Sequence, residues 1–140
     1  MDNNVIVTVT GRGELSDEAP IITRAPGKYY INNDKHYVIY ELPDEDRPSC
    51  VIRHMLIFRE HSLEMTKSAG EYRTRIMYDI GKCNLTEYNT PQGKLLLGFK
   101  TEAFSFEMTD NGLRAELRYT IMMGDEPLSK NVLEVEVQPI

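Results

Sequence analysis

Asp110-Asn111-Gly112 leads into the run Leu113-Arg114-Ala115-Glu116-Leu117-Arg118-Tyr119-Thr120-Ile121-Met122-Met123, in which apolar residues occupy every second position. This period of two residues is typical of a β-strand with one buried face. The Asn-Gly pair lies between this run and another alternating run. It predicts a β-hairpin with a type I′ turn, since that turn needs positive φ at both central residues. The stretch therefore indicates antiparallel β-structure.

The same period recurs through the rest of the chain. Alternating or apolar runs cover residues 5–10, 20–31, 36–42, 51–58, 62–67, 72–78, 84–88, 94–100, 103–108 and 133–138. Turn-forming residues separate them, and no stretch has a convincing helical period. Short connections make neighbouring strands antiparallel, so we predict a meander of about ten strands. A barrel is favoured over a sandwich because closure removes the unpaired edges of the sheet, and the strands near the two termini could pair to close it.

Length and composition are those of an ordinary globular protein. The 140 residues, 41% hydrophobic and 27% charged, suit a single domain over residues 1–140. A net charge of −6 argues against nucleic-acid binding, which depends on neutralising phosphates, and against docking on anionic lipid. No signal peptide is recognised, and no apolar run approaches the ~20 residues that span a bilayer. Cys50 and Cys83 form no CxxC motif, so we expect a cytoplasmic protein with reduced thiols.

Several segments, taken in order, resemble a known family. They are Gly27-Lys28-Tyr29-Tyr30, Tyr37-Val38-Ile39-Tyr40-Glu41, Tyr88-Asn89-Thr90-Pro91-Gln92-Gly93-Lys94-Leu95, Phe99-Lys100-Thr101 and Asn131-Val132-Leu133-Glu134-Val135-Glu136-Val137. The ordered set is similar to the YwiB-like family of uncharacterised bacterial proteins, described as calycin-like β-barrels. The resemblance implies an all-β fold with a single antiparallel calycin/lipocalin-like barrel of about 8–10 strands. It implies no settled activity and no catalytic residue.

Motifs of known catalytic and metal sites are not evident. The chain has no GxSxG nucleophile elbow, and Gly11-Arg12-Gly13 is better explained as a β-bulge than as a phosphate-binding loop. His54 and His61 flank a predicted turn, but a zinc site needs further ligands that the sequence does not place beside them. We therefore predict no catalytic residue, no metal and no cofactor, and a binding protein is favoured over an enzyme.

Basic residues on two apolar strands are candidates for a ligand site. Arg53 alternates with His54 in a run whose two faces are both apolar, so one of them must lie among apolar side chains. Arg73 and Arg75 share one face of a later run. Inside a barrel, an arginine could hold a ligand carboxylate with two hydrogen bonds. The alternative is a row of exposed arginines paired with acids such as Glu64 on a neighbouring strand.

Tyrosines supply the second group of candidates. The chain has eight tyrosines and no tryptophan. A tyrosine combines an apolar ring with a polar tip and is therefore suited to line a pocket, although it also occurs at strand edges without a ligand. The complete candidate ligand-binding set is Arg53, His54, Arg73, Arg75, Tyr78, Tyr88 and Tyr119.

Two functions of different class fit these observations. The favoured one is binding of a small lipophilic or anionic ligand inside the barrel. The alternative is a structural or protein-interaction domain with a filled barrel, which could form a homodimer. Barrels of about eight strands are either just filled by side chains or hold one small ligand, so the state of the interior separates the two hypotheses.

Overall fold

A computed structural model describes residues 3–15, 17–44, 47, 49–90 and 92–140, and its regular elements are all β-strands. No helix long and apolar enough to cross a membrane occurs in this part of the chain. The strands are β1 (Asn4–Gly13), β2 (Ile21–Asn32), β3 (Lys35–Pro43), β4 (Val51–Arg59), β5 (Ser62–Ala69), β6 (Tyr72–Asp79), β7 (Cys83–Thr90), β8 (Gly93–Thr109), β9 (Gly112–Met123) and β10 (Glu126–Pro139).

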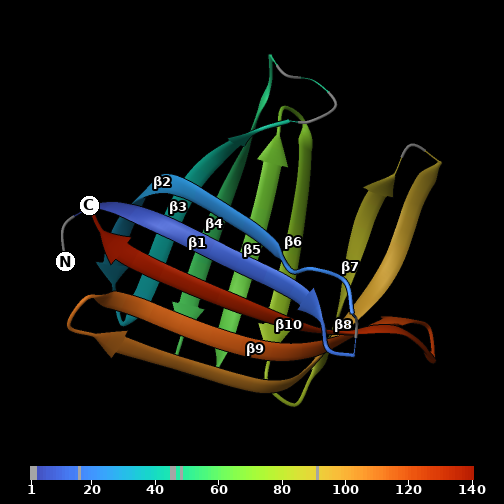
Figure 1. The fold of residues 1–140 in the computed structure, drawn as a ribbon. Coiled ribbons are helices and arrows are strands. Elements are labelled where there is room, and N and C mark those ends of the chain that lie inside the picture. The colour runs from blue at the N-terminus through green and yellow to red at the C-terminus, as the bar shows by residue number, and fades with distance from the viewer. Residues whose placement is uncertain (1–2, 16, 45–46, 48, 91) are drawn as a thin grey trace.

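One antiparallel sheet contains all ten strands, in the order β6-β5-β4-β3-β2-β1-β10-β9-β8-β7. Hairpins connect most neighbours, and β1 pairs with β10 from Val5↔Pro139 to Gly13↔Asn131. The two ends of the chain therefore lie side by side, at the left of Figure 1. The sheet curls into a nearly closed barrel, which confirms the predicted all-β barrel and the pairing of the terminal strands.

The turn chemistry differs from the prediction at one hairpin. Between β8 and β9, Thr109 pairs with Gly112, so Asp110 and Asn111 form the two-residue loop. Gly112 has a φ of 139°, while Asn111 is not among the residues with positive φ. The type I′ turn predicted for Asn111-Gly112 is therefore wrong, although the hairpin itself is confirmed. The glycine is needed beside the loop, at the first residue of β9.

Two residues elsewhere do adopt the conformation expected of a type I′ turn. Asn33 and Asp34 join β2 to β3 with φ values of 50° and 64°, which Asn and Asp tolerate better than other non-glycine residues. The bulge predicted at Gly11-Arg12-Gly13 is wrong, because β1 keeps a regular register with β10 there. The register shifts lie instead at 101–103 in β8 and at 127–129 in β10.

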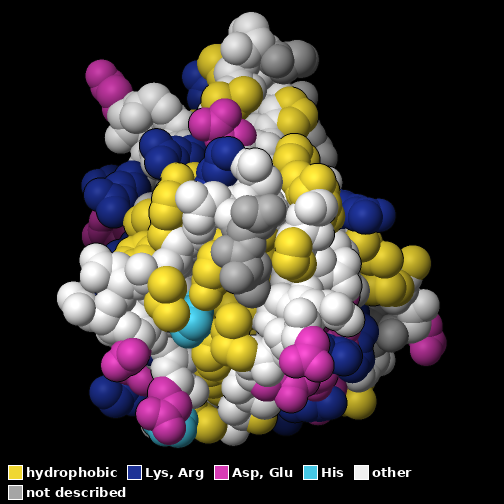
Figure 2. Space-filling view, turned by 90° about the vertical axis from the view of Figure 1, so that its left-hand side faces the viewer, with side chains coloured by type: hydrophobic (Ala, Val, Ile, Leu, Met, Phe, Trp, Pro, Cys, Tyr) yellow, Lys and Arg dark blue, Asp and Glu magenta, His cyan; other side chains and the backbone are white. Residues whose placement is uncertain are grey.

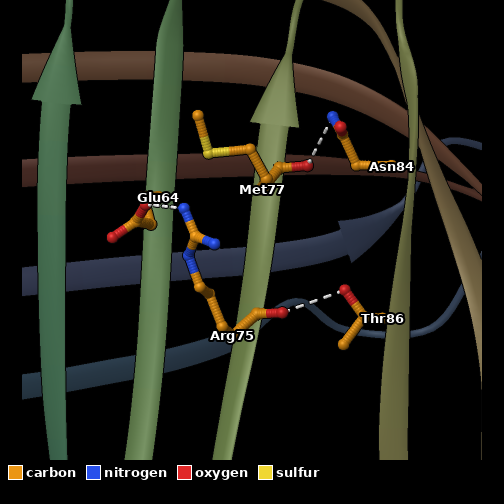
Figure 3. A network of polar contacts seen from close by, with 5 residues as sticks. All are labelled: Glu64, Arg75, Met77, Asn84 and Thr86. Atoms are coloured by element: carbon orange, nitrogen blue, oxygen red, sulfur yellow. Dashed lines mark hydrogen bonds and ion pairs between the residues drawn. The ribbon is translucent and has the colours of Figure 1, made fainter.

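The barrel closes at a seam between β6 and β7, the two edges of the sheet. No β-ladder joins these strands in the described residues. Side chains of β7 reach the backbone of β6 instead: the Asn84 amide donates to the Met77 carbonyl at 3.2 Å, and the Thr86 hydroxyl donates to the Arg75 carbonyl at 2.9 Å (Figure 3). The upper ends of β7 and β8 splay away from the barrel in Figure 1. The seam is thus held by side chains at edges that would otherwise be unpaired.

Removing the Thr86 hydroxyl should weaken this seam. Thr86→Val keeps the shape of the side chain but leaves the Arg75 carbonyl without its donor, and we expect the free energy of unfolding to fall by about 1–2 kcal/mol. Thr8→Val on β1 is the control, because Thr8 lies within a regular ladder on both sides. Urea denaturation measures both. Equal small effects in the two variants would show that the side-chain bonds do not hold the seam.

Candidate functional site

One end of the barrel interior is filled by aromatic side chains. The Phe106 ring lies 5.1 Å from that of His36 and 5.7 Å from that of Phe58, between ring centroids. The Tyr29 hydroxyl is hydrogen-bonded to His36 Nδ1 at 2.6 Å. Phe58 is completely buried. This cluster fills that end of the barrel, and the Tyr29 hydroxyl and His36 Nδ1 satisfy each other's hydrogen bonding.

The opposite part of the interior is hollow. A cavity of about 230 Å³ lies inward of the β3–β4 and β5–β6 connections. Aliphatic and aromatic side chains line most of its wall, as is typical of ligand pockets. The lining residues are Val9, Thr23, Tyr40, Leu42, His54, Met65, Lys67, Ile76, Tyr78, Tyr88, Phe99, Tyr119, Ile121 and Leu133.

A row of polar residues crosses four strands at this cavity. The register pairs Tyr40 of β3 with His54 of β4, His54 with Lys67 of β5, and Lys67 with Thr74 of β6. The Tyr40 and His54 rings stack, with centroids 4.7 Å apart and planes 9° from parallel. His54 is 8% exposed, and its Nδ1 atom is buried without a hydrogen-bond partner. Such an unpaired buried polar atom is costly and indicates a place for a ligand or water.

Burial shifts the protonation of this row toward neutral forms. Removal from water and, as the smaller cause, the charge of neighbouring Lys67 together lower the pKa of His54 to about 4. Burial also lowers the pKa of the Lys67 ammonium. The same effect raises the pKa of Tyr40 to about 12. At neutral pH, therefore, His54 and Tyr40 are uncharged hydrogen-bonding groups.

Three tyrosines and Phe99 form the other wall of the cavity. The Tyr78 and Tyr119 rings meet at an angle of 61° with centroids 4.9 Å apart, and their hydroxyls are hydrogen-bonded to each other. Tyr88 stacks on Phe99 with centroids 6.2 Å apart. Burial raises the pKa of all three tyrosines, so this wall is neutral and offers hydroxyls on an otherwise apolar surface.

Four of the seven candidate residues come together at the cavity. They are His54, Tyr78, Tyr88 and Tyr119. Their contact with a ligand remains a prediction, but the structure places all four around one space. His61, considered above with His54, lies exposed at the β4–β5 turn instead.

The three arginines lie outside the barrel. An interior position for Arg53, Arg73 and Arg75 is wrong: all three are exposed, and Arg75 forms an ion pair with Glu64 at 2.5 Å on the outer face (Figure 3). The physical reason is that β4 and β6 turn their bulkier apolar side chains inward, and an arginine is rarely buried unless paired. The alternative of exposed arginines paired with strand acids is confirmed for Arg75.

The outer surface near these arginines carries both signs of charge. Arg73 and Arg75 line a groove of about 560 Å³ along the seam, together with the acids Asp79 and Glu87. Figure 2 shows another face of the molecule, where basic and acidic side chains both stand among apolar ones. This mixture gives the groove no clear preference for an anion, so the cavity is the better candidate site.

Two titratable residues of the cavity wall, Lys67 and Tyr40, are not among the candidates. Lys67 lies on the inward face of β5 together with Leu63 and Met65, and Tyr40 lies on the inward face of β3 together with Val38. In each case the sequence pattern could have identified the residue, because a polar side chain takes a position that is otherwise apolar in an alternating run. For Lys67 in particular, that position was the sign of an interior charge.

A nearly closed ten-stranded antiparallel barrel with a cavity at one end of its interior defines the class of this protein. A family model described as a domain of unknown function (DUF1934) matches residues 7–135, so the chain belongs to that family. The crystal structure of the YwiB protein from Bacillus subtilis is similar over 98% of this chain and 90% of that one, with a TM-score of 0.77 and 15% identity. The two matches confirm the YwiB-like family, and the second shows the fold. A search of curated proteins gave no match.

Proposed function

We propose that this protein binds one small lipophilic or anionic molecule in the cavity inside its barrel. The observation that carries the proposal is the cavity itself, whose lining includes His54 at 8% exposure; the Nδ1 atom of this histidine is buried without a hydrogen-bond partner. A ligand group that hydrogen-bonds this nitrogen would remove the cost of an unsatisfied buried atom. The calycin-like kinship implied by the family resemblance supports the same role by analogy of fold alone.

The volume of the cavity limits the ligand. About 230 Å³ corresponds to about eight water molecules, at the ~30 Å³ that each occupies in the liquid. The ligand should therefore have about eight or nine non-hydrogen atoms if it fills this space alone. A long-chain fatty acid would have to extend beyond this space. Exposed, free Cys50 and Cys83 fit a protein that works in the reducing cytoplasm, which we include in the proposal.

Benzyl alcohol and benzoate, one neutral and one anionic, are suitable probes of this size. We expect at least one of them to shift the NMR signals of Tyr78, Tyr88 and Tyr119 in a saturable titration. Val9→Phe, which projects a ring into the cavity, should abolish the effect. Ile22→Phe on the outer face of β2 is the control, because Ile22 is 63% exposed. If neither probe shifts these signals, the alternative of a structural domain with a closed interior is favoured.

A further inference from the structure

Lys67 is a basic residue in an interior that offers it no acid. It faces inward from β5, opposite His54 on one side and Thr74 on the other. The other titratable side chains on the cavity wall are His54 and four tyrosines, Tyr40, Tyr78, Tyr88 and Tyr119; the described lining contains no aspartate or glutamate. Lys67 also takes part in none of the ion pairs found among the described residues.

The one acid on the same strand, β5, is directed away from this amine. Glu64 lies on the opposite face of β5 and pairs with Arg75 outside the barrel. Because side chains alternate between the two faces of a strand, Lys67 cannot share that partner. Lys67 is half-buried. A charge removed in part from water is normally paired or hydrogen-bonded, and leaving it unpaired costs free energy. Two pKa shifts agree with an unfavourable charge at this position. Burial lowers the pKa of Lys67, and the charge of Lys67 contributes to lowering the pKa of His54.

We propose that the ligand is a small monocarboxylate whose charged group binds between the Lys67 ammonium and the His54 imidazole. This inference rests on the proposed function, because it names the ligand class of the same cavity. Lys67 would supply a charge-assisted hydrogen bond, and neutral His54 can offer one N–H to the second carboxylate oxygen. The apolar part of the ligand would lie against Phe99, Ile121 and the tyrosine wall. A neutral ligand of the same shape would leave the ammonium unpaired and should bind more weakly.

The test compares benzoate with benzyl alcohol, which differ mainly in charge. We expect benzoate to bind about tenfold to a hundredfold more tightly, the range for a hydrogen bond to a charged group. Lys67→Met keeps the length of the side chain and removes its charge. In this variant benzoate should lose that advantage, while the affinity for benzyl alcohol is unchanged. Lys82→Met is the matched control, because Lys82 is exposed on the surface and pairs with Asp79 at 3.4 Å.

Stability of the free protein gives a second readout that does not depend on a ligand. Because Lys67→Met removes a half-buried charge that has no acidic partner, the variant should unfold at a higher urea concentration than the wild type. Its folded state can thus be verified before affinities are compared. A lower midpoint would show that Lys67 has a partner inside the protein and would overturn the inference.

The outcomes separate this inference from the proposed function. If benzyl alcohol binds as tightly as benzoate, or if Lys67→Met leaves the preference for benzoate intact, the carboxylate inference is wrong and the binding cavity stands. If neither probe binds, both are wrong. A preference for benzoate that disappears in Lys67→Met and persists in Lys82→Met supports the inference.

Discussion

Gly112→Ala should destabilise the protein by at least about 3 kcal/mol. Gly112 opens β9 with a φ of 139°, a conformation that L side chains rarely adopt. A Cβ atom at this position would lie 1.9 Å from the Val137 carbonyl oxygen of β10. Both groups belong to adjacent backbones of the sheet, so neither can move aside without breaking the ladder between β9 and β10.

Gly124→Ala provides the control for this experiment. Gly124 lies in the β9–β10 turn with a φ of 60°, and an added Cβ would meet nothing within 4 Å. Only the left-handed backbone conformation is then penalised, at about 1–2 kcal/mol. Urea midpoints of the two variants measure the difference. Similar losses in both would mean that the close approach of Val137 is relieved at little cost, contrary to the geometry described above.

Acidification should destabilise the barrel through His54. The pKa of His54 is about 4 in the folded protein, against 6.5 for an ordinary histidine. Above pH 6.5 the imidazole is neutral in both states, and its contribution is constant. As the pH falls below that value, the unfolded chain takes up a proton that the folded protein does not, so stability decreases. The loss should reach about 3 kcal/mol near the folded pKa and then level off.

The difference between wild type and His54→Gln isolates this contribution from that of the carboxylates. Glutamine does not titrate, so the variant should lose about 3 kcal/mol less than the wild type between about pH 7.5 and about pH 4. His36, whose pKa burial also lowers, contributes in the same direction in both proteins and cancels in the comparison. His61→Gln, at an exposed position in the β4–β5 turn, should follow the wild type. A wild-type profile in His54→Gln would show that the pKa of His54 does not differ between the folded and unfolded states.

Much of the fold follows from local alternation. Residues 113–123, with apolar side chains at every second position, form β9 as predicted, and Asn33-Asp34 lies in a turn whose backbone those residues tolerate. Part of the site could also be predicted from the sequence. Tyr78, Tyr88 and Tyr119 were candidates because of their chemistry, and their strands place them around one cavity. Lys67 takes a position that is otherwise apolar in its alternating run and could have been identified by the same reasoning.

Local sequence could not decide which face of β4 is inward. One face of the strand carries Val51, Met55 and Ile57, and the other carries Ile52, Leu56 and Phe58, so both faces are apolar. The pairing with β3 and β5 decides which face points inward, because it aligns the face of Ile52, Leu56 and Phe58 with the buried residues of both neighbouring strands. His54 is inside and Arg53 outside for that reason, and Arg73 and Arg75 are outside because β6 follows the register of β5.

The sequence by itself determined the strands, their antiparallel succession and the polar residues available to a site, because a period of two residues and the turn residues act over a few neighbours. Only the tertiary structure decided that the barrel closes by side-chain bonds between β6 and β7, that one end of its interior is filled, and that Lys67 and His54 share a cavity without an acid. Those properties depend on pairing between residues far apart in the chain, and a local pattern carries no information about such pairing.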